Sequence, residues 1–212
     1  MRDGRRRMRP TNRDLPGPSP LPPDEDEVAL LRRVARKDRY AFELLYRSYY
    51  RRLTRFLEQT TRAPQLIGEI LDDTMLVVWR KAATFNGESR VSTWIFAIAY
   101  RRALKALERE RRWVQISADA DEPASADSPE TEFIERESRF ALQSLLVALS
   151  VEHRTVIELT YYHGCAYKEI ATIVGCPVNT VKTRMFYAHR KLKAILIGRA
   201  KESGDDAPLP LR

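Results

Sequence analysis

Hydrophobic residues along the chain recur with the spacing of amphipathic helices. The first stripe steps by three or four residues and comprises Phe42, Leu45, Tyr49, Leu53 and Phe56. A second stripe comprises Ile67, Ile70, Leu71, Thr74 and Val78, and a third starts with Trp94, Ile95 and Ile98. Apolar residues at this spacing line one face of an α-helix. Because no alternating pattern is long enough to suggest a sheet, we predict an all-α fold.

Two stretches interrupt the helical pattern and divide the chain. The N-terminal stretch has six arginines in its first 13 residues and half of the 12 prolines, which predicts a disordered extension. It is either a solvated tail or a non-specific tether to nucleic acid. The stretch from Ser117 to Glu132 has six acids and no Lys or Arg, which is typical of a flexible linker. We therefore predict an extension over 1–24, a helical domain over 25–112, an acidic linker over 113–132, a smaller helical domain over 133–198 and a disordered tail over 199–212.

Composition narrows the class of protein. The 212 residues include 37 Lys and Arg against 29 Asp and Glu, a net charge of +8. This charge allows nucleic acid or another anionic surface as a partner without choosing between them. The longest apolar run, Trp94 to Tyr100, is far shorter than the about 20 residues of a membrane helix, so we expect no membrane insertion. No apolar segment follows the basic N-terminus, and two cysteines suit a reducing compartment, so we expect a cytoplasmic protein.

The segment from Ala166 to Leu196 predicts a helix-turn-helix. A short helix over Tyr167 to Val174 is followed by Gly175, which favours a left-handed turn. Pro177 then favours the first turn of a longer helix. No acid occurs from Ile170 to Ala200, so this module is strongly basic.

In a docked helix-turn-helix, the N-terminal turns of the second helix enter the major groove of DNA. The alternative is an amphipathic helix with a merely solvated basic face, and the turn chemistry together with the missing acids favours DNA binding. The residues that we expect to face base edges are Asn179, Lys182 and Thr183. Those that we expect to hold phosphates are Thr180, Arg184 and Arg190.

These motifs together resemble the extracytoplasmic-function (ECF) class of bacterial sigma-70 factors over about residues 28–198. The second domain is similar to sigma domain 4 through LLVALSVEHR, EIATIVG and NTVKTR. The first is similar to sigma domain 2 through FELLYRSYYRRL, ILDDTMLVVW and VSTWIFAIA. The resemblance implies a transcription initiation factor that binds core RNA polymerase and directs it to promoters. Its first domain would open the minus-ten region, and its second would read the minus-35 element.

The resemblance also implies roles for residues of the first domain. Trp94 would be a stacking wall for a flipped base, with a core tryptophan as the alternative. The full minus-ten set is Asn86, Glu88, Ser89, Trp94, Arg101, Arg102, Lys105 and Arg109. The set for docking on the beta-prime coiled-coil of the polymerase is Glu69, Asp72, Asp73, Val77 and Trp79. The implied partners are therefore core polymerase, through beta-prime and the beta flap, and promoter DNA.

The docking helix departs from the family pattern. Leu66 and Gly68 occupy positions that are usually acidic, and Asp72 stands where the family has Gln. Our hypothesis is that a phosphothreonine at Thr60 or Thr61 supplies the missing negative charge, as in an acid-poor subset of the family that a Ser/Thr kinase activates. The alternatives are two ordinary threonines in an exposed interhelical loop and control by an anti-sigma factor.

Nothing in the sequence predicts catalysis. The spacing of His163, Cys165 and Cys176 fits no metal-ligand set, and no glycine-rich nucleotide motif occurs, so we expect no metal, no cofactor and no enzyme activity. The alternative function is an autonomous helix-turn-helix regulator, which would bind an operator unaided as a dimer. A sigma factor would instead bind promoter DNA feebly alone and support transcription with core polymerase.

Overall fold

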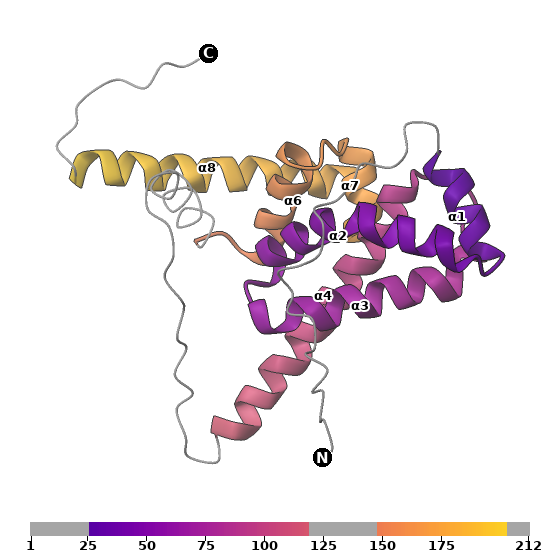
Figure 1. Ribbon diagram of the computed structural model, residues 1–212. Coiled ribbons are helices and arrows are strands. Elements are labelled where there is room, and N and C mark those ends of the chain that lie inside the picture. Colours follow the sequence, from indigo (N-terminus) through magenta and orange to yellow (C-terminus); the bar gives the residue numbers. More distant parts are fainter. Residues whose placement is uncertain (1–25, 119–147, 203–212) are drawn as a thin grey trace, which may run out of the picture.

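The computed structural model of the chain describes residues 26–118 and 148–202, and every regular element within these two ranges is helical (Figure 1). The fold class is therefore all-α, as predicted. The basic extension, most of the acidic linker, residues 133–147 of the predicted second domain and residues 203–212 lie outside the described residues. Residues 199–202, which were predicted to belong to the disordered tail, are part of the last helix. The N-terminal unit consists of α1 (Glu27–Ala35), α2 (Arg39–Thr61), α3 (Pro64–Lys81), the short 3-10 helix η1 (Ala82–Thr84) and α4 (Val91–Ala118). The C-terminal unit consists of α6 (Val151–Tyr161), α7 (Tyr167–Val174) and α8 (Val178–Glu202).

Side chains that cap the helices explain where several of them begin. Asp26 accepts a hydrogen bond from the Val28 backbone amide at the start of α1. Asp38 accepts one from the Ala41 amide at the start of α2. Pro64 opens α3, where its missing amide proton costs no helical hydrogen bond. These are the residue types that favour a helix N-terminus, so local chemistry sets these boundaries.

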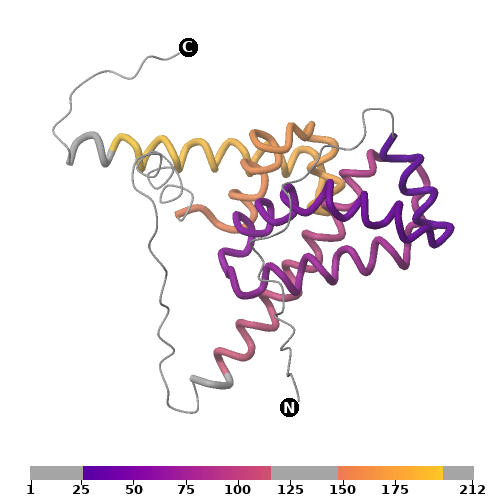
Figure 2. The backbone as a smooth tube through the Cα atoms, viewed as in Figure 1, coloured from indigo at the N-terminus to yellow at the C-terminus, as the bar shows by residue number. Residues whose placement is uncertain are grey.

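The predicted stripes form the core of the N-terminal unit. Leu45, Tyr49, Leu53 and Phe56 of α2 are fully buried, and the second stripe is buried along α3. Phe42 is the exception in its stripe, because it is only partly buried at the edge of the core. The helix α4 continues to Ala118, so it passes the boundary at residue 112 that the sequence predicted. Figure 2 shows that the C-terminal parts of α4 and α8 extend beyond the packed body.

The two units pack directly against each other. The helix α6 lies on α2, and α7 lies on α4, so that buried residues of both units form one continuous hydrophobic cluster. The tube in Figure 2 shows the orange segment lying against the indigo and magenta ones. The sequence predicted two helical domains joined by a linker but did not predict this contact.

Candidate functional site

The helix-turn-helix forms as the sequence predicts. Gly175 ends α7 with a φ of 70°, in the left-handed region that a side chain disfavours. Its amide donates to the carbonyl of Ala171 at 2.9 Å. The turn then passes Pro177, and the next helix, α8, begins at Val178. This geometry fixes the direction in which the first turns of α8 leave the unit.

The first turns of α8 present polar side chains on their outer face. Asn179, Lys182 and Thr183 are exposed, whereas Val181 and Met185 are buried against the unit. The Thr183 hydroxyl donates to the carbonyl of Asn179 at 3.0 Å, which orients this side chain on the helix surface. Of the residues expected at phosphates, Arg190 is exposed, and Thr180 and Arg184 are partly buried.

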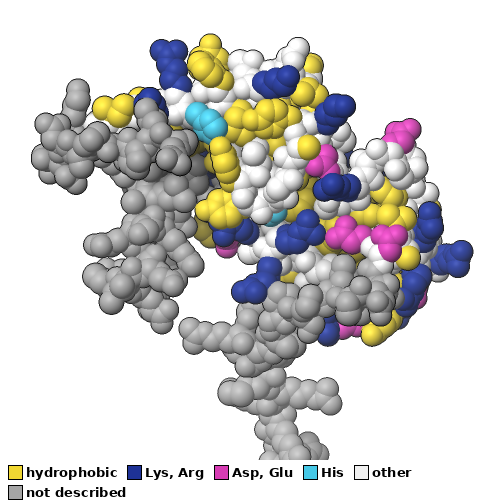
Figure 3. Space-filling model, turned by 90° about the horizontal axis from the view of Figure 1, so that it is seen from above, with side chains coloured by type: hydrophobic (Ala, Val, Ile, Leu, Met, Phe, Trp, Pro, Cys, Tyr) yellow, Lys and Arg dark blue, Asp and Glu magenta, His cyan; other side chains and the backbone are white. Residues whose placement is uncertain are grey.

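The face that carries α8 also has exposed apolar side chains. Tyr161 of α6 and Phe186 of α8 have exposed fractions of 63% and 62%. The Tyr161 hydroxyl lies 3.0 Å from Nε2 of His189. Figure 3, which looks down on the molecule from the side of α8, shows hydrophobic side chains next to Lys and Arg on this face. Exposed apolar side chains among basic ones are more typical of a macromolecular contact surface than of a solvated helix face.

A hollow of about 410 Å³ lies beside Trp94. Its polar lining is basic, and apolar residues close the remaining wall. The lining residues are Val77, Lys81, Thr84, Trp94, Ile98, Arg101, Arg102 and Lys105. The structure thus brings four of the residues expected at the minus-ten region to one place: Trp94, Arg101, Arg102 and Lys105. Lys81 and Thr84 were missed by sequence reasoning, because only the packing of α3 against α4 brings them to the hollow.

The loop between η1 and α4 lies next to this hollow. Within the loop, the Asn86 side chain accepts a hydrogen bond from the Glu88 amide at 3.1 Å, and Gly87 has a φ of 78°. The ring of Phe85 packs edge-on against Trp94, with 5.7 Å between ring centroids. Trp94 is only partly buried, so one part of its ring packs on the unit and another lines the hollow.

The residues expected to dock polymerase are divided between two sides of α3. Asp72 and Trp79 line a second hollow, of about 450 Å³, together with aromatic and apolar side chains of α2 and α3. Asp72 accepts a hydrogen bond from the Tyr46 hydroxyl at 3.1 Å. Val77 instead lines the basic hollow beside Trp94. Glu69 and Asp73 instead face arginines of α4.

The aromatic side of the second hollow has a definite geometry. Phe42 and Trp79 meet edge to face with ring centroids 5.1 Å apart. The ammonium group of Lys37 lies 5.1 Å from the Trp79 ring and donates to the Trp79 carbonyl at 2.8 Å. Tyr46 and Leu76 extend this apolar lining. In the sequence Phe42 belongs to a helical stripe and Tyr46 to a family motif, and only the structure shows that both line a surface hollow.

Buried polar groups occupy the contact between α2 and α6. Glu158, with 1% of its side chain exposed, pairs with Arg55 at 3.0 Å. Burial raises the pKa of the Glu158 carboxyl above its ordinary value. Arg154 donates to the backbone carbonyls of Gln59 and Thr60, and so caps the C-terminal end of α2. A charged group of one unit thus satisfies the helix terminus of the other.

The helix α7 contacts the N-terminal unit beside residues that are expected to contact DNA. Glu169 of α7 pairs with Arg90, at the end of the loop before α4, with 3.3 Å between charged atoms. The hydroxyl of Thr93 donates to the same carboxylate at 3.4 Å. Because Thr93 precedes Trp94, this contact places α7 of the C-terminal unit next to the basic hollow.

The expectation that Thr60 and Thr61 lie in an exposed loop is wrong. Both belong to the last turn of α2, and they are 0% and 7% exposed. The Thr61 hydroxyl donates to the Leu57 carbonyl at 2.9 Å, and Arg154 covers the backbone beside Thr60. The reason is the packing of α6, which the helical pattern does not encode. In this arrangement neither hydroxyl is open to a kinase.

The titratable groups of residues 26–118 and 148–202 do not form a metal centre. Among the described residues, no three His, Cys, Asp or Glu side chains gather where they could hold a metal ion. Burial raises the pKa of the Cys165 thiol to about 11, which disfavours the thiolate that binds metals. Over the same residues, no helix is both long and apolar enough to cross a lipid bilayer.

Sequence comparison matches both units to known families. Family models described as Sigma-70 region 2 and Sigma-70, region 4 match residues 45–113 and 139–192. The chain is 32% identical over 187 residues to the ECF RNA polymerase sigma factor SigK of Mycobacterium bovis, with 86% of this chain and 98% of the relative covered. It is 27% identical over 197 residues to the RNA polymerase sigma-H factor of Pseudomonas aeruginosa, with 88% and 96% covered.

Two solved structures have similar folds. One is CnrH in complex with the cytosolic domain of CnrY, with a TM-score of 0.60 at 22% identity, covering 81% of this chain and 97% of that chain. The other is the sigma factor RpoE in complex with the anti-sigma factor NepR from Bartonella quintana. It has a TM-score of 0.56 at 25% identity and covers 68% of this chain and 89% of that chain.

Proposed function

Because the chain belongs to the ECF class of sigma-70 factors, which direct RNA polymerase to promoters, we propose that its two units contact two promoter elements through different faces. The first turns of α8 read the minus-35 element, and the basic hollow beside Trp94 holds the opened minus-ten region. Core polymerase docks on α3 through the beta-prime coiled-coil and on the C-terminal unit through the beta flap. The chain itself supplies no catalytic group, since RNA synthesis belongs to the core enzyme.

The observation that carries the proposal is the basic hollow with its aromatic wall. Four cationic side chains around it suit the phosphates of a separated strand, and the Trp94 ring offers a surface on which an unpaired base stacks. A ligand sensor of an autonomous regulator has no use for such a surface. The polar face of α8 supplies the second contact, because amide, ammonium and hydroxyl groups are the usual partners of base edges in the major groove.

Use of both elements at once requires the units to separate. Glu169 touches Thr93 beside the hollow, and Asn179 follows only ten residues later, so the two DNA faces lie within ~35 Å of each other. The minus-ten and minus-35 elements are about 25 base pairs apart, or roughly 85 Å along the helix axis. We therefore take the packed arrangement to be a closed state that opens when polymerase sets the spacing.

Two kinds of control are compatible with this closed state. An anti-sigma factor is one, since one solved relative is a sigma factor bound to an anti-sigma factor. Phosphorylation of Thr60 or Thr61 is the other, and it requires α6 to leave α2 first, because both side chains are buried beneath that contact. If kinase control operates, Thr61→Glu should be retained on core polymerase more strongly than the unmodified protein in a pull-down. Equal retention would count against it.

Transcription from a defined template tests the main proposal. We expect the purified chain with core polymerase to produce run-off transcripts from the promoter upstream of its own gene. Lys182→Ala should reduce this transcription roughly tenfold, since a base contact contributes about 1–3 kcal/mol. Lys168→Ala removes another exposed charge from α7, outside the reading face, and serves as the matched control.

The outcomes separate the two candidate functions. A sigma factor shows little footprint alone and directs initiation with core polymerase. An autonomous regulator protects an operator without polymerase and directs no initiation. The second result would overturn the proposal.

A second experiment addresses the hollow itself. Trp94→Ala removes the stacking surface, which is worth about 1–3 kcal/mol for each base. We expect weaker permanganate reactivity of minus-ten thymines in complexes that still form at the minus-35 element. Unchanged permanganate reactivity would indicate that Trp94 is a core residue and does not stack on a base.

A further inference from the structure

The residues expected to dock polymerase and those expected to hold promoter DNA are paired with each other. The helices α3 and α4 are antiparallel neighbours, so acids on one face arginines on the other. Glu69 accepts two hydrogen bonds from Arg109, at 2.8 and 2.9 Å. Asp73 lies 3.7 Å from Arg102. We call these four residues the charge seam.

A small hollow runs along the charge seam. Its volume is about 110 Å³, and both acids and both arginines line it together with Lys105. The ammonium group of Lys105 therefore adds a third cation to the same place. The hollow adjoins the one beside Trp94, because Arg102 and Lys105 line both. A phosphate that entered from the DNA side would meet arginines already engaged by carboxylates.

These pairs are exposed enough to exchange partners. The side chains of Arg109 and Glu69 are 62% and 51% exposed, and those of Arg102 and Asp73 are 35% and 50% exposed. Exposed ion pairs contribute little to stability, so either partner can be replaced at small cost. By contrast, the Arg55–Glu158 pair has a buried carboxylate and is not exchangeable in this way.

We infer that the charge seam couples polymerase docking to DNA binding. In the free protein, Glu69 and Asp73 neutralise Arg109 and Arg102 and weaken contact with nucleic acid. When a basic surface of polymerase engages the two acids, the arginines are released to the DNA backbone. The coupling is reciprocal, because DNA that engages the arginines frees the acids for polymerase. This inference rests on the proposed function for the choice of both partners.

The first test measures binding of the free protein to a 20-nucleotide oligothymidylate by fluorescence anisotropy. Glu69→Gln with Asp73→Asn should bind this probe about threefold to tenfold more tightly than the wild type. Two released arginines should also steepen the dependence of log affinity on log salt by about 1.4, at roughly 0.7 for each phosphate contacted on a single strand. The charge-matched control is Glu43→Gln with Glu108→Gln.

The control separates partner exchange from net charge. Glu43 pairs with Arg47, and Glu108 pairs with Arg112, each on its own helix. The control therefore removes two exposed negative charges without touching the charge seam. We expect less than a twofold change in affinity and salt dependence. Equal tightening by the two double variants would overturn the inference.

The second test measures binding to core polymerase instead of binding to DNA. Fluorescently labelled Arg102→Gln with Arg109→Gln should bind core polymerase severalfold more tightly than the wild type in the absence of DNA, because its two acids are no longer neutralised. Arg111→Gln with Arg112→Gln removes two other exposed cations of α4 and should leave core binding unchanged. Unchanged or weaker binding of the first variant would contradict the coupling. Neither test depends on run-off transcription, which separately decides whether the chain is a sigma factor that uses the proposed DNA faces.

Discussion

His163 follows α6 and packs against the aromatic core of the other unit. Its ring centroid lies 4.6 Å from that of Phe96 and 6.0 Å from that of Phe56, and 5% of its side chain is exposed. Burial, with the nearby charges of Arg52 and Arg55, lowers the pKa of His163 to about 4. The contact between the units therefore requires a neutral imidazole.

This burial predicts a sensitivity to acid. Above pH 6.5 the imidazole is neutral in folded and unfolded chains, so the contribution to stability is complete. As the pH falls from 6.5 towards 4, the unfolded chain takes up the proton first, and the free energy of unfolding should fall by about 2 kcal/mol at pH 5. Urea unfolding of the wild type and His163→Gln at several pH values measures the difference.

Glu158 contributes a pH dependence of the opposite sign to the free energy of unfolding, and it is present in both proteins. Its raised pKa means that the folded carboxyl binds a proton more tightly than the unfolded one, which favours folding as the pH falls. Because Oε1 of Glu158 lies 3.7 Å from Nε2 of His163, the difference between the two pH profiles reports on His163 together with this contact. Parallel profiles would show that the imidazole does not titrate as described.

Arg154 is the other residue whose role depends on the contact between units. Desolvation lowers its pKa to about 10, so it stays charged at neutral pH. Arg154→Met should leave the carbonyls of Gln59 and Thr60 without this donor and reduce the free energy of unfolding by about 2–3 kcal/mol. Arg51→Met, at an exposed position of α2, is the control and should change stability by less than about 0.5 kcal/mol. Urea unfolding at pH 7 would refute the assignment if both variants behaved alike.

At the scale of elements, glycine has opposite effects on the stability of the protein at a position inside α3 and at the position that ends α7. Gly68 lies inside α3, and Gly175 ends α7 with a φ of 70°. A Cβ atom added at either position meets nothing within 4 Å, so sterics with other residues do not decide the outcome. Backbone conformation does.

We therefore expect alanine to act in opposite directions at these two sites. Gly68→Ala should stabilise the protein by about 0.5–1 kcal/mol, since alanine favours the helix. Gly175→Ala should destabilise it by about 1–2 kcal/mol, since a side chain strains the left-handed conformation. Chemical denaturation monitored by circular dichroism gives both values, and Gly175→Asn should recover part of the loss. A change in the free energy of unfolding with the same sign for both alanine variants would contradict this explanation of the turn.

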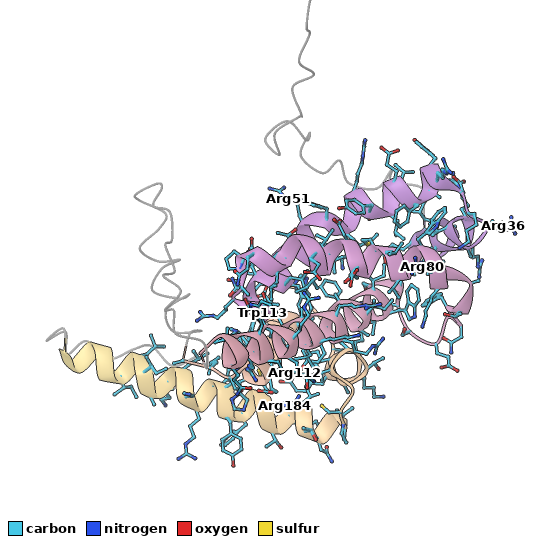
Figure 4. The ribbon with its side chains drawn as sticks, turned by 90° about the horizontal axis from the view of Figure 1, so that it is seen from below. Arg36, Arg51, Arg80, Arg112, Trp113 and Arg184 are labelled. Atoms are coloured by element: carbon cyan, nitrogen blue, oxygen red, sulfur yellow. The ribbon has the colours of Figure 1, made fainter. Side chains whose placement is uncertain are left out.

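At the scale of the whole molecule, the closed packing of the units is the feature with most consequence for function. Figure 4 shows Arg184 on α8 and Arg112 near the end of α4, while Arg36 and Arg80 lie at the other end of the molecule and Arg51 on α2. Basic side chains are thus distributed over several faces.

Opening can be followed by energy transfer between two dyes. Cysteines introduced at Tyr40 and Leu196, both exposed, place one dye on each unit after Cys165 and Cys176 are replaced by Ser. Transfer should be high in the free protein and should fall when core polymerase is added, because the α2–α6 and α4–α7 contacts separate. Constant transfer on binding to core, in a sample that supports transcription, would show that the units stay packed.

The sequence alone determined the elements and the kind of chemistry they carry. The helix over Tyr167 to Val174 has the predicted bounds, because a hydrophobic period and a left-handed glycine are properties of a short segment. The class of DNA-contacting module follows from the same local information. The family follows from the order of several such segments along the chain.

Tertiary structure decided which elements meet. Arg154 buries Thr60 and caps α2 from the other unit, and Glu69 pairs with Arg109 of the neighbouring helix. Each of these contacts joins residues that are far apart in sequence. Lys81 reaches the hollow beside Trp94 for the same reason. A helical pattern shows which face of a helix is apolar, but it does not show which other helix covers that face, because the free energy of burial has no direction and depends only on the apolar area removed from water.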